Sequence, residues 1–348
     1  MRIRAASASL FLSAALAGCA PTAGEDVDAT QEPLAAATTT RTDLFVASFF
    51  GSSIQRFAGP LTATPGAALP TAGNSGADYA TRVARRPWPL TLGRDGNLYT
   101  TDLEASPGVA RIHGALASNA GKPDPAPGQS GDTFTPGIAS SAIGVGLDGN
   151  LYVGAGTVVQ RIDAKSGAVL GTFTSGYALG PIQTLAFNRV GTLFVGTFDS
   201  CVEGPSGCTG QKGEVVKFDG YSGRYLGTYV ANGVGGLALP YGFAFDTDDN
   251  LYVANWSGPS NTGTVLRYHQ PHAATPGAPF PSTGLGGARF TAHDSNPVAL
   301  AFGPDGRLYA SDLSGDVVVR YDANGAFLGT FAAVSGGPRG LGFFSSRD

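Results

Sequence analysis

The sequence predicts an all-β protein, a six-bladed β-propeller built from four-stranded antiparallel blades. Three observations predict it: the composition, a repeat that recurs six times, and a C-terminal segment that completes the first repeat. Glycine accounts for 52 of the 348 residues, and charged residues make up 14% of the chain. Because soluble domains average about 7% glycine and about 25% charged residues, this composition favours short strands joined by many tight turns.

The repeat follows residue 43 and is centred on a short apolar and aromatic strand. In five copies another apolar strand and a tight turn precede it, as in LTLGRDGN and LAFGPDGR, and a third strand such as VVQRID follows. A fourth strand is visible in GAVLGTF, GRYLGTY and GAFLGTF. Alternating apolar and polar positions bounded by turn residues indicate antiparallel hairpins, so four strands make one blade. The six central strands begin at Leu44, Leu98, Leu151, Leu193, Leu251 and Leu308.

The first repeat lacks its opening strand, and the C-terminal segment RGLGFF, Arg339–Phe344, matches that strand. Pairing the two closes the ring and hides the strand edges at which sheets otherwise aggregate. Residues 43–348 then form one propeller with about fifty residues per blade, near the ~40–50 of known propeller repeats. Aspartates between the strands, such as Asp305 in GPDG and those of DTDDN, are interpreted as turn residues.

With these residues the chain resembles the NHL-repeat family of six-bladed propellers, whose units read roughly as an apolar strand, DG, LYVAD and RVQRF. Segments such as LDGNLYVG and GPDGRLYASD carry the resemblance. It covers the whole repeat region and implies the propeller fold. It implies no single function, because the family includes binding modules as well as enzymes.

Residues 1–18 read as a signal peptide, because Arg2 and Arg4 precede an apolar run that is too short to span a bilayer. The LAGC stretch that ends at Cys19 is similar to a bacterial lipobox. That resemblance implies acylation of Cys19 and anchoring in the lipid bilayer of the bacterial cell envelope. It implies the outer membrane if the organism has one, because no Asp follows the cysteine. The alternative is an ordinary secretory signal with a chance cysteine.

Residues 19–42 are small, polar and mildly acidic, so we expect a disordered tether between the anchor and the propeller. The two remaining cysteines, Cys201 and Cys208, flank the sequence VEGPSG. In an exported protein this closable loop predicts a disulfide. A metal site formed by the two thiolates is the alternative.

Charge and motifs argue against several functions. The formal net charge is −4 and no cluster of Lys or Arg stands out, so the sequence offers no electrostatic footprint for nucleic acid. It has no Gly-x-Ser-x-Gly elbow and no His-Glu-x-x-His zinc motif. It also lacks the His-x-Glu pair of the streptogramin-lyase propellers. We therefore predict no catalytic residue and no cofactor.

One face of the predicted disc carries the long loops, and binding residues usually lie on long loops held by a rigid scaffold. The residue ten positions before each central leucine is expected at the mouth of the channel on this face, with the C-terminal strand serving the first blade. These residues are Trp88, Ser141, Gln183, Tyr241, Val298 and Arg339.

None of these six residues is acidic or an asparagine. The chain also resembles, in DGNLYV, the gluconolactonase-like propellers, in which Glu, Asn and Asp side chains near these strand starts hold a divalent metal. The departure from that pattern disfavours a channel-bound calcium or other divalent metal, and with it lactone hydrolysis. We predict no metal ligand.

The ends of the second strands form another ring: Ser48, Asp102, Ala155, Thr197, Asn255 and Asp312. Short polar side chains at such positions commonly bond their own turns. Alternatively, Asp102, Asn255 and Asp312 form a polar and aromatic platform with Tyr241 and Trp256. The sequence thus favours a non-catalytic module that binds a small molecule, a glycan or an envelope protein at the long-loop face. A hydrolase or lyase for a small lactone, sugar or peptide is the first alternative, and a structural or adhesion protein of the envelope is the second.

Overall fold

The structure is a computed structural model, and it describes residues 40–81, 86–102, 107–199, 203–204, 207–208, 212–256, 263–293 and 295–347. The predicted signal peptide, residues 19–39 of the predicted tether, Cys201 and the side chain of Cys208 lie outside this description, so the anchor and the disulfide stay predictions. Within the described part, no helix is long and apolar enough to cross a membrane.

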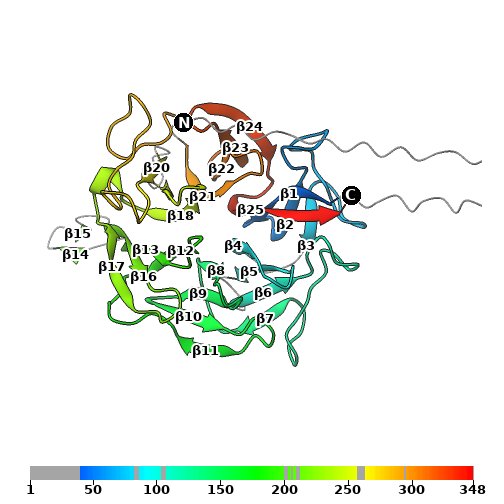
Figure 1. The fold of residues 1–348 in the computed structure, drawn as a ribbon. Coiled ribbons are helices and arrows are strands. Elements are labelled where there is room, and N and C mark those ends of the chain that lie inside the picture. Colours follow the sequence, from blue (N-terminus) through cyan, green and yellow to red (C-terminus); the bar gives the residue numbers. More distant parts are fainter. Residues whose placement is uncertain are drawn as a thin grey trace, which may run out of the picture. The chain divides into compact units, whose positions relative to one another are not determined.

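Six antiparallel sheets form the blades of a propeller, as the repeat predicted (Figure 1). In blade order, with the innermost strand first, the first three blades contain β25 (Pro338–Arg347), β1 (Thr40–Ser48), β2 (Ser53–Phe57) and β3 (Asp78–Thr81); β4 (Pro87–Leu92), β5 (Leu98–Asp102), β6 (Gly108–Ile112) and β7 (Thr133–Pro136); and β8 (Ile143–Val145), β9 (Leu151–Ala155), β10 (Val158–Ile162) and β11 (Val169–Thr172). Strand β1 begins inside the segment assigned to the tether.

The other three blades contain β12 (Ile182–Phe187), β13 (Leu193–Asp199), β16 (Lys212–Phe218) and β17 (Tyr225–Val230); β18 (Pro240–Phe245), β19 (Leu251–Asn255) and β20 (Thr264–Tyr268); and β21 (Pro297–Phe302), β22 (Leu308–Asp312), β23 (Val317–Tyr321) and β24 (Phe327–Ala333). A short hairpin of β14 (Glu203–Gly204) and β15 (Gly207–Cys208) lies between β13 and β16, and a 3₁₀ turn, η1 (Val234–Gly236), precedes β18.

The fifth blade has three regular strands where the repeat predicts four. Irregular chain takes the fourth position: Phe290 donates its amide to the Val265 carbonyl at 2.8 Å, and Arg267 donates to Ala288 at 2.7 Å. The glycines of this segment, GLGGAR, disfavour a regular strand, because glycine loses more conformational freedom on ordering than other residues do.

The C-terminal strand closes the ring, as predicted. Strand β25 pairs antiparallel with β1, from Thr40 opposite Arg347 to Ala47 opposite Gly340. The innermost strands β25, β4, β8, β12, β18 and β21 contact one another in that cyclic order. Strand β25 therefore fills the position between β4 and β21 and completes the ring of innermost strands.

Six apolar clusters hold the propeller together, and each lies between two neighbouring blades. The central strand explains this arrangement, because successive side chains of a strand point to opposite faces. In blade 2, for example, Leu98 packs into the cluster shared with blade 1, and Tyr99 packs into the cluster shared with blade 3. The leucine and aromatic residue of each repeat thus bind one sheet to both of its neighbours.

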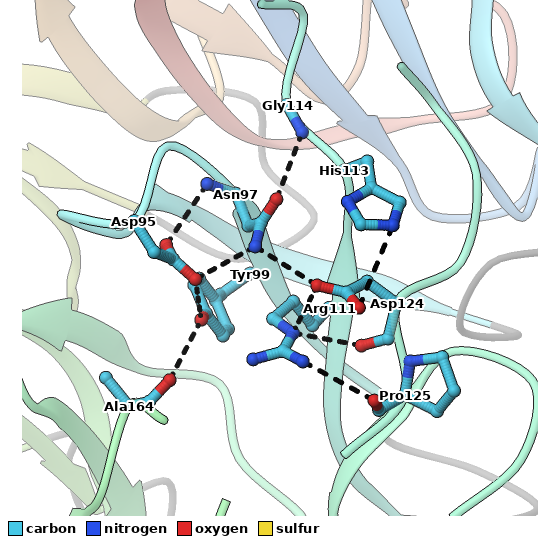
Figure 2. A network of polar contacts seen from close by, with 9 residues as sticks. All are labelled: Asp95, Asn97, Tyr99, Arg111, His113, Gly114, Asp124, Pro125 and Ala164. Carbon is cyan, nitrogen blue, oxygen red and sulfur yellow. Dashed lines mark hydrogen bonds and ion pairs between the residues drawn. The ribbon is translucent and has the colours of Figure 1, made fainter. Parts of the chain in front are cut away.

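The turn aspartates hold the hairpins, which confirms their interpretation as turn residues. Figure 2 shows the network in blade 2: Asp95 accepts hydrogen bonds from the Asn97 amide at 3.1 Å and from the Tyr99 hydroxyl at 2.7 Å. Three other blades repeat the carboxylate–tyrosine pair, with Tyr152 on Asp148, Tyr252 on Asp246 and Tyr309 on Asp305. In blade 4 the positions hold Val190 and Phe194, so the carboxylate and the hydroxyl are both missing.

A buried carboxylate links the three strands where the ring closes. Asp43, on β1, is fully buried. It accepts hydrogen bonds from Arg56 Nε on β2 at 2.9 Å, from Ser346 Oγ on β25 at 2.6 Å, and from the Gly59 amide at 3.1 Å. Arg41 Nε also lies 3.0 Å from it. One acidic side chain therefore fastens strands that are far apart in sequence.

Candidate functional site

The innermost strands are bulged at one end of the channel, and these bulges position the candidate side chains. In five blades the register between the innermost and second strands shifts at the start of the innermost strand. The extra residue is Arg339, Gln183, Tyr241 or Val298 in four blades, and in blade 2 Trp88 and Pro89 together face one residue. A bulge re-aims a side chain and is common beside functional sites.

The same end of the channel brings the two sequence-derived rings together. Pro240, beside Tyr241, pairs with Asn255, and Pro297 pairs with Asp312. Asp102 pairs with Pro87, next to Trp88. The first residues of innermost strands and the last residues of second strands therefore lie at one mouth.

A cavity of about 100 Å³ opens at this mouth. Residues from the innermost strands of all six blades, or from just before them, line it, and five of the six residues expected there are among them: Trp88, Ser141, Tyr241, Val298 and Arg339. The sixth, Gln183, lies beside the cavity wall, with its Oε1 at 3.4 Å from Ser141 Oγ.

Aromatic side chains from different blades gather around Tyr241. Its ring centroid lies 5.0 Å from that of Trp256, 6.1 Å from that of Trp88 and 6.4 Å from that of Phe198. Phe49 packs edge-on against Trp88, with the centroids 5.4 Å apart and the planes at 90°. We call Phe49, Trp88, Phe198, Tyr241 and Trp256 the mouth cluster. Trp88 and Trp256 are the two tryptophans of the chain.

A guanidinium lies among these rings. Arg339 Cζ is 4.0 Å from the centroid of Trp88 and 5.1 Å from that of Phe49, within the range of cation–π attraction. Burial lowers the pKa of Arg339 to about 10, and Tyr241 opposes the shift. The group is therefore cationic at neutral pH. Burial also raises the pKa of Tyr241, and Arg339 opposes that shift, so the phenol is neutral at the same pH.

Arg339 has no acidic partner in the described part of the chain. Tyr241 is the single titratable group there that acts on the pKa of Arg339. The buried Nε of Arg339 has no hydrogen-bond partner among the described atoms. Trp256 Nε1 is also buried without a partner among the described atoms. Because a buried charge is costly when it is unpaired, this half-buried cation is unusual for a purely structural position.

Comparison with known proteins supports the fold and leaves the function open. The family model described as strictosidine synthase-like, N-terminal, matches residues 281–320. A search of curated proteins finds no match. Among solved structures, a chain of a nidogen/laminin complex is similar, with a TM-score of 0.59 at 15% identity over 87% of this chain and 98% of that one.

Two further structures are similar. A protein of unknown function from Bacteroides caccae gives a TM-score of 0.53 at 13% identity, covering 87% of this chain and 98% of that one. A gluconolactonase from Xanthomonas campestris gives a TM-score of 0.49 at 17% identity, and the match covers 86% of this chain and 87% of that one. The fold is a six-bladed propeller. At these identities the likeness extends to the fold alone.

The polar platform candidates bond mainly to their own surroundings. Asn255 accepts the amides of Ala238 and Leu239 at 2.9 and 3.1 Å. Asp312 accepts the amides of Ser314 and Asn296 at 3.1 and 3.3 Å. These contacts fit the interpretation that such side chains hold their turns. Asp102 is buried at the end of β5.

Sequence reasoning missed Phe49 and Phe198. A signal for both is present, because each directly follows the last residue of the second-strand ring, as Trp256 follows Asn255. The same position holds Leu103, Gly156 and Leu313 in the other blades. The aromatic residues are therefore a departure from the repeat in three blades, and departures from a repeat are where function is added to a scaffold.

The described residues contain no group of three or more His, Cys, Asp or Glu side chains that could hold a metal ion. The prediction that no metal or cofactor binds stays a prediction. The chemistry of the mouth is aromatic and cationic, which suits recognition of a ligand by stacking and charge.

Proposed function

We propose that the protein is an exported, lipid-anchored module that binds a ligand at the mouth of its propeller channel without changing it. The observation that carries the proposal is the mouth cluster together with Arg339: β-bulges in different blades aim Trp88, Tyr241 and Arg339 at one cavity. Ligand sites are concave, mostly apolar and fitted with a few fixed polar groups. A small molecule, a glycan or an exposed part of an envelope protein fits this description.

The two tryptophans make the proposal testable by intrinsic fluorescence. Because Trp88 and Trp256 both lie beside Tyr241, a ligand at the mouth should change the emission saturably. We expect Tyr241→Ala to weaken binding about tenfold, equivalent to about 1.4 kcal/mol, since a stacking partner is lost. The measurement is a titration with a panel of sugars, short peptides and ring-containing acids.

Tyr221→Ala is the matched control, because Tyr221 is 73% exposed in a turn outside the mouth cluster. It should bind as the unaltered protein does. The proposal is contradicted if no compound changes the emission, or if Tyr241→Ala and Tyr221→Ala bind alike. Conversion of a bound compound to product would favour the hydrolase or lyase alternative. Binding only to envelope polymer would favour the adhesion alternative.

The anchor is part of the same proposal and has its own test. Cys19→Ala should move the protein from the membrane fraction to the soluble fraction after cell lysis, because acyl chains on Cys19 would supply the membrane affinity. Cys201→Ala is the control and should stay with the membranes. If Cys19→Ala stays on the membranes and incorporates as much fatty acid as the unaltered protein does, acylation of Cys19 is refuted.

A further inference from the structure

We propose that the ligand at the channel mouth is a small organic carboxylate carried on a ring, with its carboxylate held by Arg339 and its ring packed against Trp88 and Tyr241. This inference rests on the proposed function and narrows it to a class of ligand. It is carried by the geometry around Arg339 and by the absence of a neighbouring acid among the described residues.

The side chain of Arg339 makes no hydrogen bond or ion pair with the described residues, and its Nε is buried. The guanidinium carbon lies over the Trp88 ring at 4.0 Å, with Phe49 at 5.1 Å. A guanidinium stacked on an aromatic ring still carries N–H donors along its edge. A carboxylate can accept two such N–H groups in parallel, which is a charge-assisted and bidentate pairing.

The cation at Arg339 favours an anionic ligand, because the two carboxylates at the same mouth, Asp102 and Asp312, do not act on its pKa. Tyr241 is neutral at physiological pH because burial raises its pKa. A half-buried cation with no acidic partner among the described residues gains one when an anion binds, and it repels a divalent cation. The same site therefore disfavours the metal that a channel carboxylate cluster would attract.

The aromatic rings and the cavity size define the rest of the ligand. Trp88 and Tyr241 are tilted by 32° with centroids 6.1 Å apart, and they flank the cavity together with Arg339. Planar or ring-shaped bodies pack well on such surfaces. The cavity of about 100 Å³ is small beside the roughly 300–1,000 Å³ of pockets for drug-sized ligands. It admits a carboxylate and the ring that bears it, and little more.

Matched pairs of probes separate the contribution of the carboxylate to affinity from that of the ring. The pairs are benzoate with benzyl alcohol and glucuronate with glucose, and the members of each pair share a ring but differ in the carboxylate. By tryptophan fluorescence and calorimetry we expect at least one carboxylate to bind tenfold or more tightly than its neutral partner, with an affinity that falls as salt rises. Inorganic phosphate is a third arm: binding as tight as that of the carboxylates would overturn the requirement for a ring.

Arg339→Gln tests the residue itself. It should lower the affinity for the carboxylate ten- to a hundredfold and leave the neutral partner unchanged, with Arg339→Lys between the two because an ammonium cannot pair in the same planar way. Arg307→Gln is the matched control, since Arg307 lies in an exposed turn and pairs with Asp305 at 3.5 Å. It should behave as the unaltered protein.

The melting temperature of the ligand-free Arg339→Gln variant shows whether Arg339 serves ligand binding or the stability of the fold. Removing an unpaired, half-buried charge should leave the melting temperature of Arg339→Gln unchanged or higher. A clear fall in melting temperature would mark Arg339 as structural and overturn the inference. If neutral and anionic probes bind equally and only Tyr241→Ala weakens them, the inference fails and the proposed function stands. If no probe and no member of the wider panel binds, both fail.

Discussion

Removing strand β25 by ending the chain at Gly337 is expected to abolish the single cooperative unfolding transition of the propeller. The strand completes blade 1 and contacts the innermost strands of blades 2 and 6. Phe343 packs against Tyr309 with centroids 4.8 Å apart, and Phe344 packs against Phe45 at 5.6 Å. These two side chains lie on opposite sides of blade 1, so their loss opens both of its interfaces.

Magnitudes indicate that this loss exceeds the stability of the whole fold. Truncating a buried leucine such as Leu341 costs about 2–5 kcal/mol, while a native protein is stable by about 5–15 kcal/mol in total. Deletion of β25 also removes the partly buried Phe343 and Phe344 and the ladder to β1. The bared edge of β1 should then pair with other copies.

Circular dichroism melts and size-exclusion chromatography with light scattering measure this result. The control ends at Ser346, which keeps the Ser346 hydroxyl on Asp43 at 2.6 Å. It should melt as a monomer in one transition. A protein ending at Gly337 that also melts as a monomer, at a similar temperature, would show that ring closure contributes little.

Asp43→Ala is expected to lower the free energy of unfolding by about 3–5 kcal/mol at neutral pH, the usual cost of breaking a buried ion pair. Arg56, which places Nη2 2.7 Å from Asp43, would be left without that carboxylate, and Ser346 would lose its acceptor. Urea unfolding measures the change. Asp163→Ala is the control, because Asp163 holds an exposed turn through Ser166, and it should change stability far less.

Acid should reproduce the effect of the substitution. Burial by itself would raise the pKa of Asp43, but hydrogen bonds from Ser346, Arg56 and Arg41 outweigh it and hold the pKa below its ordinary value. A carboxyl with a depressed folded-state pKa contributes stability above its unfolded pKa of about 4, and loses it as pH falls through the folded value. The difference between the unaltered protein and Asp43→Ala should therefore shrink below pH 4. A difference that stays constant there would contradict this role of Asp43.

The repeat made most of the fold readable from the sequence. Leu98 and Tyr99 are one of six equivalent pairs. In each pair the leucine and the aromatic residue lie on opposite faces of the sheet, so the pattern recurs wherever a blade packs between two others. The matching segment Arg339–Phe344 predicted closure for the same reason. The irregular fourth position of blade 5 escaped prediction, because a glycine-rich segment can bond to β20 without forming a strand.

The candidate site was only partly readable. Counting back from the repeat located Trp88, Tyr241 and Arg339, because bulges occur at the same place in several blades. Phe49 and Phe198 were missed, since an apolar residue after a strand looks like any other core residue. Asp43 was missed because its partner Ser346 is 303 positions away.

The sequence by itself determined the number of blades, the ring closure and the structural role of the turn aspartates, since these follow from local periodicity and turn chemistry that repeat along the chain. Only the tertiary structure decided that an arginine with no acidic partner in the described part of the chain lies over Trp88 within a cluster of aromatic residues. That arrangement joins side chains from different blades through space. Its energies depend on burial and on neighbouring charges, which the order of residues along one strand does not record.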